Sequence, residues 1–415
     1  MKPTIGILSL GCPRNLVDSE SILGRLIQKG YKIVEIDKAQ VAIVNTCAFI
    51  EDAKRESVDA ILDLVELKKE GRLKKIIVFG CLPQRYKAIL NKELPEVDAF
   101  VGRVSLEAGL SRFAITPRHY AYLKICEGCV NLCSFCIIPK IKGRFLSLPV
   151  NSILNKVEDF DRSKISELNI IGQDITCFGI DLDASINLAK LLRKIVKKAK
   201  NIGWLRLLYL NPRRISDDLL KIIRDEQKIC KYIDLPIQHI NDRILKLMNR
   251  GTSRDKIIHV IDKIRKTIPN VALRTSVITG FPGETDKEFE ELLKFIKDTK
   301  FERLGAFSYS REEGTKAYGF KNQVSEAVKL RRYNQVMSLQ QEVSREVNRK
   351  FIGKTLEVLV DECKDGSYLG RSEFDAPEVD GLVYINSKRT LNLGDFVRLK
   401  ITDTLEYDLI GEEEG

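Results

Sequence analysis

Four cysteines lie within eleven residues near the middle of the chain, at Cys126, Cys129, Cys133 and Cys136. Four thiolates could bind a structural zinc ion, but the short spacing of the inner pair leaves little chain for two zinc-knuckle turns. All four could also hold a ferredoxin-like cluster, although Ile137 stands where such motifs usually have proline. If only the last three bind iron, one iron of a 4Fe–4S cluster has no protein ligand. An open coordination position of this kind is typical of catalytic metal centres, and the spacing alone leaves all three interpretations open.

Three further cysteines, Cys12, Cys47 and Cys81, each follow a short apolar run that predicts a strand. They are separated by 34 and 33 residues, about one strand and one helix each. Parallel strands end at the same edge of their sheet, and open α/β sheets bind ligands at that edge. We therefore expect the three thiols to lie together; the alternative is three structural cysteines that pack as small apolar side chains.

The residues around these cysteines alternate between apolar runs, which predict strands, and amphipathic stretches, which predict helices. In the first hundred residues we expect strands at 5–10, 41–44 and 75–79 and helices at 17–29, 51–69 and 84–91. A longer alternation then predicts strands at 121–125, 167–171, 205–209, 231–235, 272–278 and 303–308. The helices between them are expected at 152–160, 188–200, 217–225, 254–267 and 286–298. Thr285 and Glu288 form a capping-box pattern before the last of these helices.

These patterns predict an α/β protein with three domains. Residues 1–115 are expected to form a small parallel α/β sheet domain. Residues 116–349 are expected to form a partial (β/α)6 barrel, followed by a long helix at 325–350, with its site at the carboxyl ends of the strands. Residues 350–415 are expected to form a small β-barrel, with short strands at 356–360, 382–385 and 396–401.

The composition is that of a globular protein, with 44% apolar and 31% charged residues in a chain of 415. It excludes a disordered or collagen-like chain, and no run approaches the roughly 20 apolar residues of a membrane helix. The first apolar run is too short for a signal peptide, so we expect a cytoplasmic protein. In that setting ten cysteines indicate metal binding or catalysis rather than a disulfide framework.

Charge is distributed unevenly along the chain. Residues 350–415 carry 8 Lys and Arg against 15 Asp and Glu, whereas residues 1–349 carry 61 and 43. A basic body can contact RNA phosphates, and an acidic C-terminal domain favours a basic partner. The alternative is that both are solvated surface.

The spacing Cys129-x-x-x-Cys133-x-x-Cys136, with Phe135 before the last cysteine, resembles the radical SAM superfamily. In that superfamily the open iron binds the amino and carboxylate groups of S-adenosylmethionine. One electron from the cluster then cleaves the sulfonium and produces a 5′-deoxyadenosyl radical, so the cofactor carries the chemistry. The resemblance implies that these three cysteines bind the radical-generating cluster and that Cys126 does not.

Two cysteine triplets in one chain resemble the plan of the methylthiotransferases. The resemblance covers the whole chain: an N-terminal cluster domain, a radical SAM barrel and a C-terminal TRAM barrel. Two runs resemble the RimO branch of that family, Ser9-Leu-Gly-Cys-Pro-Arg-Asn-Leu-Val-Asp-Ser-Glu20 and Gly370-Arg-Ser-Glu-Phe-Asp-Ala-Pro-Glu-Val-Asp-Gly381. Shorter matches are Ile171-Gly-Gln-Asp174, Asp234-Leu-Pro-Ile-Gln-His239 and Gly280-Phe-Pro-Gly-Glu284.

The resemblance implies an enzyme with two 4Fe–4S clusters that uses S-adenosylmethionine both as methyl donor and as radical source. Cys12, Cys47 and Cys81 would bind the auxiliary cluster, which carries the sulfur. The RimO branch replaces a β-carbon hydrogen of an aspartate in small-subunit ribosomal protein twelve by a methylthio group. The implied partners are that basic protein and an electron donor such as flavodoxin or ferredoxin. No membrane is implied, and RNA contact is secondary.

Three alternatives differ in substrate or class. The same chemistry on adenosine in transfer RNA predicts a basic TRAM face and salt-dependent RNA binding. An electron-transfer protein would not turn over S-adenosylmethionine, and a zinc-stabilised RNA-binding protein would contain no iron. The TRAM signature carries four acidic residues, which favour a basic protein over RNA as partner, at Glu373, Asp375, Glu378 and Asp380.

A few other residues carry weaker expectations. Gln173 and Asp174 follow the second barrel strand and are expected to line the S-adenosylmethionine pocket. His239 either faces the site or packs in a turn. The remaining thiols are expected to be ordinary buried side chains, at Cys177, Cys230 and Cys363.

Overall fold

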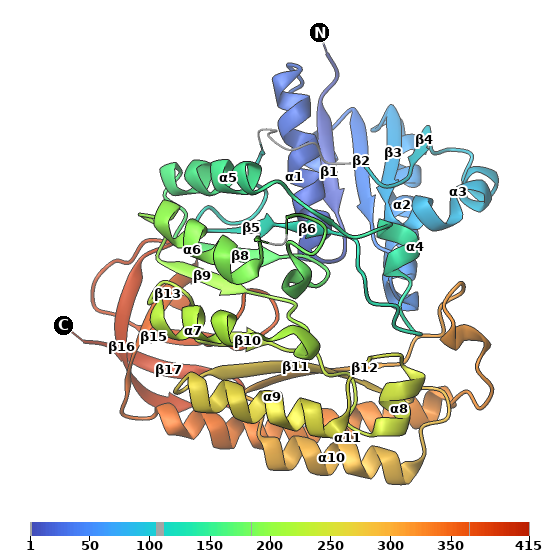
Figure 1. The fold of residues 1–415 in the computed structure, drawn as a ribbon. Coiled ribbons are helices and arrows are strands. Elements are labelled where there is room, and N and C mark those ends of the chain that lie inside the picture. Colours follow the sequence, from blue (N-terminus) through green and yellow to red (C-terminus); the bar gives the residue numbers. More distant parts are fainter. Residues whose placement is uncertain (1, 105–111, 184, 365, 415) are drawn as a thin grey trace. The chain divides into compact units, whose positions relative to one another are not determined.

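The computed structural model describes residues 2–104, 112–183, 185–364 and 366–414. The chain packs as two compact units (Figure 1). Unit 1 comprises Met1–Ile115, Glu127–Ser152 and Ser310–Tyr318, and unit 2 comprises Thr116–Cys126, Ile153–Tyr309 and Gly319–Gly415. None of the helices in the described ranges combines the length and apolar character needed to span a membrane.

Unit 1 is built on a four-stranded parallel sheet, as the alternation of strands and helices predicts. The strands lie in sequence order, β1 (Ile5–Ser9), β2 (Val41–Thr46), β3 (Lys75–Gly80) and β4 (Ala99–Val101). Ser9 pairs with Asn45, and Thr46 pairs with Gly80, so the first three strands end almost level. Every residue of β2 is buried, which is why this strand is continuously apolar up to Val44. The short strand β4 was not predicted.

Helices cover this sheet and connect its strands: α1 (Pro13–Gln28), α2 (Glu51–Lys69) and α3 (Cys81–Glu93), with the 3-10 turn η1 (Ile36–Lys38). The segment after the central cysteines adds α4 (Ile138–Lys142) and β7 (Leu146–Ser147). Ile137 and Ile141 belong to the same hydrophobic core as Val44, Ile61 and Val78. Burial of apolar area therefore holds this segment on the unit-1 sheet.

Unit 2 begins with six parallel strands, which confirms the partial barrel. They are β5 (Tyr120–Lys124), β8 (Glu167–Ile171), β9 (Trp204–Leu207), β10 (Tyr232–Asp234), β11 (Ala272–Thr279) and β12 (Arg303–Ser308). β5, β8 and β9 form one sheet, and β10, β11 and β12 another. Between β9 and β10 the side-chain carboxylate of Asp234 accepts a hydrogen bond from the Tyr209 N–H at 2.8 Å. The backbone carbonyl of Asp234 accepts one from the Leu210 N–H at 3.0 Å. These bonds join the two sheets where regular pairing stops.

The remaining helices alternate with these strands. They are α5 (Val150–Arg162), α6 (Leu188–Lys198), α7 (Asp217–Asp225), α8 (Asp242–Leu247), α9 (Arg254–Thr267), α10 (Asp286–Thr299) and α11 (Glu326–Asn348). The 3-10 turns are η2 (Ile175–Cys177), η3 (Pro212–Arg214), η4 (Ala317–Gly319) and η5 (Arg349–Phe351), and β6 (Cys126–Glu127) is a short strand. The capping box of Thr285 and Glu288 is present at the start of α10.

The C-terminal residues form a closed five-stranded barrel, as predicted. Its order is β13 (Thr355–Lys364), β14 (Ser367–Ser372), β15 (Val383–Asn386), β17 (Leu409–Glu413) and β16 (Phe396–Thr404). β14 and β17 were not predicted. Cys177 and Cys230 are buried, but the prediction that Cys363 is buried is wrong, because it lies in the exposed end of β13.

Two of the four acidic residues of the TRAM signature, Asp375 and Asp380, are bound within unit 2. Arg303 Nε donates to Asp375 at 2.7 Å, and the Tyr232 hydroxyl donates to Asp380 at 2.6 Å. Asp375 is only 1% exposed. The expectation that these carboxylates attract a basic partner is therefore wrong for this pair, because each buried charge is compensated inside the unit.

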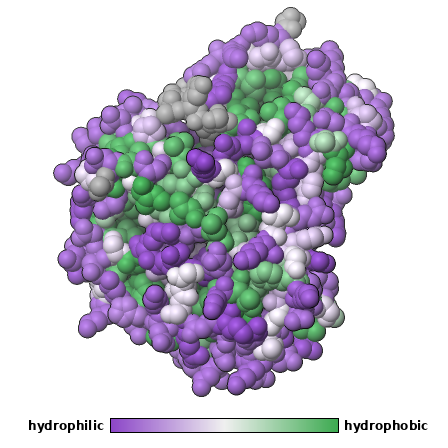
Figure 2. Space-filling model, turned by 45° about the vertical axis from the view of Figure 1, so that its right-hand side comes forward, coloured by the Kyte–Doolittle hydropathy of each residue, from purple (hydrophilic) through white to green (hydrophobic). Residues whose placement is uncertain are grey.

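Hydrophilic side chains, with apolar patches between them, cover most of the face seen in Figure 2.

Candidate functional site

The strand-end triad consists of Cys12, Cys47 and Cys81, and all three lie in unit 1 at the carboxyl edge of the parallel sheet. Cys12 is the N-cap of α1, Cys47 directly follows β2, and Cys81 is the first residue of α3. Gly11 has φ +85, and a Cβ there would lie 2.6 Å from Cys47 Cβ and 3.0 Å from its Sγ. A glycine is therefore required for the first loop to approach the second thiol.

Buried amides and hydroxyls tie the three loops together. Asn15 is 1% exposed, and its Nδ2 donates to the carbonyls of Leu10 and Thr46, both at 3.2 Å. Its Oδ1 lies 3.8 Å from the Cys81 thiol. Ser57 on α2 accepts the N–H of Cys47 at 3.0 Å and donates to its carbonyl at 2.8 Å. Satisfied buried polar groups of this kind define one arrangement of the loops.

Burial and charge affect the thiols of this triad in opposite directions. Burial raises the pKa of Cys12, but the Arg14 guanidinium, the backbone N–H of Asn15 and the charge of Lys142 together outweigh it, and the pKa of Cys12 lies below its ordinary value. Arg14 Nε donates to Cys12 Sγ at 3.4 Å. Burial raises the pKa of Cys47, and it raises the pKa of Cys81 to about 12, against the opposing charge of Lys142. Cys12 is thus the thiol most readily present as the thiolate that binds metal.

The loop triad consists of Cys129, Cys133 and Cys136, each partly exposed. The backbone N–H and the side-chain Nδ2 of Asn131 both lie 3.4 Å from Cys129 Sγ, and the N–H of Cys136 donates to the Cys133 carbonyl at 3.1 Å. The turn is fixed by Gly128, whose φ is +72. Burial raises the pKa of Cys136 to about 12, and the neighbouring thiols Cys133 and Cys129 add to the increase.

The two triads lie in the same compact unit and share a basic neighbour. The charge of Arg14 acts to lower the pKa of Cys12 and Cys47 in the strand-end triad and that of Cys136 in the loop triad, although burial keeps the pKa of Cys47 and Cys136 above the ordinary value. A second cation, Lys142, acts on the strand-end triad from the segment that follows the loop triad. All six cysteines that the sequence singled out therefore belong to unit 1.

Lys142 is held in place by two carboxylates. Its Nζ lies 3.1 Å from Asp18 Oδ2 and 3.5 Å from Glu127 Oε1, and the residue is 4% exposed. Arg103 donates to its carbonyl. Burial lowers the pKa of Lys142, but the two carboxylates outweigh it and keep the ammonium charged. Neither Arg14 nor Lys142 was assigned a role from the sequence. Arg14 lies in the matched run at 9–20, whereas nothing in the sequence distinguishes Lys142 from other lysines.

Among the described residues, no group of three or more Cys, His, Asp or Glu side chains is arranged to hold a single metal ion. The thiolates around a cluster of four irons stand farther apart than the ligands of one ion, for which Zn–S bonds are about 2.3 Å. Cys126, which was not expected to be a ligand, is completely buried, and its Sγ lies 3.9 Å from the Asp174 carbonyl in unit 2.

The residues expected to line a cofactor pocket or to face the site lie in unit 2. Asp174 is 3% exposed; it caps η2 by accepting the Thr176 N–H at 3.1 Å and pairs with Arg214 Nη1 at 3.1 Å. Gln173 is half-buried. His239 is fully buried and packed in a turn, since Nδ1 accepts the Asn241 N–H at 3.0 Å.

With that tautomer, Nε2 of His239 carries the proton and donates to Glu284 at 3.1 Å. Glu284 also accepts the N–H of Gly280 at 2.7 Å and pairs with Arg332 at 2.6 Å. The matched run at 280–284 therefore forms a buried polar network, and of the two interpretations of His239 the packed one is observed.

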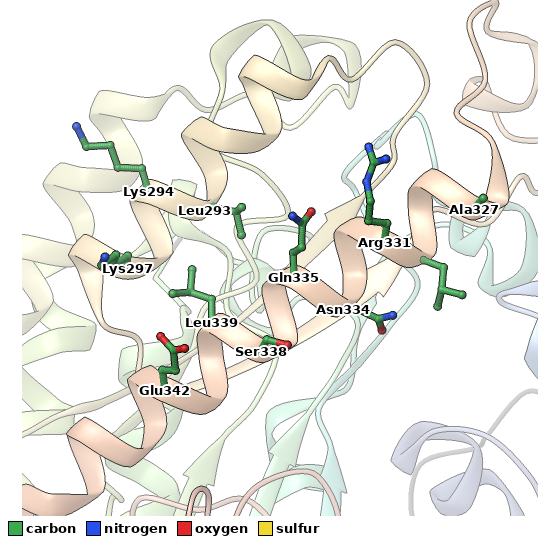
Figure 3. Close-up of a pocket in the computed structure, with 11 residues that line it drawn as sticks. Leu293, Lys294, Lys297, Ala327, Arg331, Asn334, Gln335, Ser338, Leu339 and Glu342 are labelled. Atoms are coloured by element: carbon green, nitrogen blue, oxygen red, sulfur yellow. The ribbon is translucent and has the colours of Figure 1, made fainter.

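A groove between α10 and α11 is lined by side chains of these two helices alone (Figure 3). Leu293 comes from α10, and Leu330, Leu339 and Arg331 come from α11. None of the cysteines contributes to it. The groove is thus separate from the candidate site.

Three family models match successive parts of the chain. Residues 4–102 match the family described as Uncharacterized protein family UPF0004, residues 123–296 match the radical SAM superfamily, and residues 352–413 match the TRAM domain. The chain is 46% identical to "Ribosomal protein uS12 methylthiotransferase RimO" of Thermoanaerobacter sp. (strain X514), with 98% of this chain and 99% of that protein covered. It is 48% identical over the same shares to the protein of that name from Caldanaerobacter subterraneus subsp. tengcongensis.

Solved structures share the fold at low sequence identity. The radical S-adenosylmethionine methyltransferase TsrM from Kitasatospora setae matches with a TM-score of 0.55 at 12% identity, covering 88% of this chain and 82% of that one. The cobalamin-dependent S-adenosylmethionine radical enzyme OxsB matches with a TM-score of 0.51 at 12% identity, covering 83% and 56%. At this identity the likeness establishes the architecture alone.

Proposed function

The chain belongs to the RimO family of radical SAM methylthiotransferases, and on this basis we propose that it inserts a methylthio group at the β-carbon of an aspartate in ribosomal protein uS12. The full-length match to relatives of that name supports this substrate over adenosine in transfer RNA. The observation that carries the proposal is that both cysteine triads lie in one compact unit of the structure.

We propose that each triad holds one 4Fe–4S cluster, and that Gln173 and Asp174 contribute to the S-adenosylmethionine pocket. The donor sets fit such clusters, because each triad supplies three thiols and thus leaves one of four irons open. When bound, the clusters and S-adenosylmethionine supply the electron, the carbon radical and the methylthio group.

The chain's own residues prepare the thiols for metal binding. Arg14 favours the thiolate form of Cys12, and Lys142 places a second positive charge near Cys81. Because metal ligands must be deprotonated, these cations promote loading of the strand-end triad at neutral pH. Asn15 and Ser57 hold the backbone on either side of the thiols and limit the motion of the loops.

The proposal is tested by anaerobic reconstitution, iron analysis and mass spectrometry of the product. The wild-type protein is expected to hold about eight iron atoms, and a triple Ala variant of either triad about four. The strand-end variant should still cleave S-adenosylmethionine without adding sulfur, whereas the loop variant should do neither. Cys363→Ala, on an exposed thiol outside both triads, is the matched control.

Purified uS12 and unmodified transfer RNA are offered as separate substrates in this assay. Methylthio transfer to transfer RNA and not to uS12 would contradict the proposal, as would native-rate transfer by the strand-end variant. Flavodoxin or ferredoxin is proposed as the electron donor, and either can replace dithionite in the same assay. RNA contact is proposed as secondary, so nuclease treatment of the assay should leave transfer to uS12 intact.

A further inference from the structure

We propose that the segment Ser310–Tyr318 is a clamp that fixes the spacing of the two cysteine triads, and that Glu312 is the positioning residue on which this clamp segment depends. The segment belongs to unit 1, as the six cysteines do, although Tyr309 before it and Gly319 after it belong to unit 2. This inference deepens the proposed function and rests on it, because both triads must then act on one carbon of the substrate.

The clamp segment is folded around Glu312. The Ser310 hydroxyl donates to Glu312 Oε1 at 2.7 Å, and the Thr315 hydroxyl donates to the Glu312 carbonyl at the same distance. The Thr315 N–H donates to that carbonyl as well, at 3.2 Å. The carboxylate and the carbonyl of one residue thus fix the turn, and satisfied buried polar groups of this kind define a single arrangement.

The clamp segment is attached to the strand-end triad through Arg85. This residue lies on α3, four positions after Cys81, and its Nη1 donates to Glu312 Oε2 at 2.8 Å. The same Nη1 donates at 2.6 Å to the carbonyl of Ala48, the residue after Cys47. The guanidinium therefore joins Glu312 to the loops of the second and the third strand-end cysteine.

A second cation lies beside the same carboxylate. Lys54 Nζ, on α2, is 3.2 Å from Glu312 Oε2. The side chains of Glu312, Arg85 and Lys54 are only 2%, 7% and 15% exposed, so water screens this cluster poorly. Without the charge of Glu312 the two cations would repel each other, and the clamp segment would lose what binds it to α2 and α3.

The clamp segment is also attached to the loop triad. The Ala317 N–H donates at 2.7 Å to the carbonyl of Ser134, which lies inside that triad. Ala317 and Ser134 are 0% and 2% exposed, so this bond is protected from water. Gly314 has φ +80, and a Cβ there would lie 3.3 Å from Cδ1 of Ile137, the residue after Cys136. The clamp segment therefore packs closely against the end of the loop triad.

One short segment is thus bonded to the loops of both triads, and its two attachments, at Glu312 and Ala317, are five residues apart. A shift at one attachment is passed to the other along a turn that is held by its own hydrogen bonds. Misplacing a reacting group by about 1 Å can cost about 10²-fold in rate. The clamp segment should therefore decide how often cleavage of S-adenosylmethionine leads to methylthio transfer.

The first test uses the metal-free protein without substrate. Glu312→Gln keeps the size of the side chain and removes its charge, so amide hydrogens at 47–50 and at 131–136 should both exchange faster than in the wild type. Those of β2 should exchange at the wild-type rate. Glu313→Gln is the matched control, because its side chain is exposed and it keeps the carbonyl that accepts Arg85 Nη2 at 3.1 Å.

Two outcomes of the exchange measurement would overturn the inference. Faster exchange at 47–50 alone would show that Glu312 serves only the strand-end triad. Equally faster exchange in β2 would show that Glu312 supports the general stability of unit 1 and not the spacing of the triads.

The second test measures coupling in the reconstituted protein. Methylthio groups added to purified uS12 are counted per S-adenosylmethionine cleaved, and this ratio should fall about tenfold in Glu312→Gln. Glu312→Asp keeps the charge and should recover part of the ratio, which keeps the test decisive if Glu312→Gln does not fold. Pulsed electron paramagnetic resonance of the reduced protein should give a broader distribution of distances between the clusters in Glu312→Gln than in Glu313→Gln.

A wild-type ratio together with a wild-type distance distribution in Glu312→Gln would overturn the inference. Loss of iron from this variant would do the same, since Glu312 would then support cluster binding and not spacing. The proposed function is tested separately, because it fails if the wild-type protein does not modify uS12. If the wild type modifies uS12 and Glu312→Gln is fully coupled, the function stands and only the clamp is wrong.

Discussion

The ammonium of Lys142 lies 3.1 Å from the Asp18 carboxylate, so the segment that follows the loop triad is bonded to the helix that follows the first strand-end cysteine. Both partners are buried, at 4% and 6% exposure. Burying such a charge pair costs free energy, but removing one partner costs more, because the other charge then stays buried without compensation. It therefore fixes how two segments 124 residues apart in sequence are placed within unit 1.

Replacing Lys142 by Met should destabilise unit 1, because Asp18 and Glu127 would remain buried without their cation. We expect the free energy of unfolding to fall by about 3–5 kcal/mol in urea titrations of the metal-free protein. Adding Asp18→Leu should recover part of the loss. Lys69→Met is the control, since its pair with Glu66 is exposed and should contribute less than about 1 kcal/mol. Unchanged stability in Lys142→Met would show that the pair has no such role.

Replacing Gly11 by Ala should disturb the strand-end triad. The new Cβ would lie 2.6 Å from Cys47 Cβ, on a backbone with φ +85, so the first and second loops must separate. We expect reconstituted protein to lose about half of its iron while the loop triad still supports cleavage of S-adenosylmethionine. Gly71→Ala is the matched control: φ is +75 and nothing lies within 4 Å, so it has the strain without the collision. Full iron loading in Gly11→Ala would contradict the expectation.

Replacing Arg303 by Met should loosen the C-terminal barrel within unit 2. Asp375 would be left buried without its partner, at an expected cost of about 3–5 kcal/mol. In this variant the amide hydrogens of the signature run at 370–381 should exchange faster than in the wild type, whereas those of the unit-1 sheet should exchange at the wild-type rate. Arg345→Met removes an exposed pair with Glu406 and serves as the comparison. If both variants exchange alike, the buried pair does not hold the loop.

The pH dependence of stability should carry a contribution from Glu288. Burial raises its pKa, but bonds from Arg243 and Thr285 outweigh this and lower it from 4.5 to about 2. The unfolded chain therefore binds more protons between these values, so stability rises with pH across that window and is lost as pH falls through it. Glu288→Gln should reduce the slope of the urea midpoint plotted against pH between about pH 2 and 4.5. Glu290→Gln, exposed on the same helix, should leave the slope unchanged.

Much of the architecture follows from local patterns. The predicted bounds of α2, α7, α9, β8 and β12 are those observed, because each has strong periodicity and clear end signals. Strands β14 and β17 escaped prediction because they carry glycine and charge, and only the hydrogen bonds that close the barrel make them strands. Tertiary pairing there overrides a weak intrinsic preference.

The candidate site divides in the same way. Cys129, Cys133 and Cys136 were predicted from their spacing, and Cys12, Cys47 and Cys81 from the apolar run that precedes each of them, since those signals are local. Arg14 and Lys142 were not predicted as parts of the site, because their effect depends on thiols that are distant in sequence. The acidic signature was interpreted as surface for the same reason: its arginine partners lie about 70 to 170 residues earlier.

The sequence by itself determined the chemistry available to this protein: two thiol triplets, the order of strands and helices, and the family to which they belong. Only the tertiary structure decided which charges act on those thiols and which carboxylates remain for a partner. Spacing and periodicity act over a few residues along the chain, whereas the energy of a charge depends on its burial and its neighbours in space.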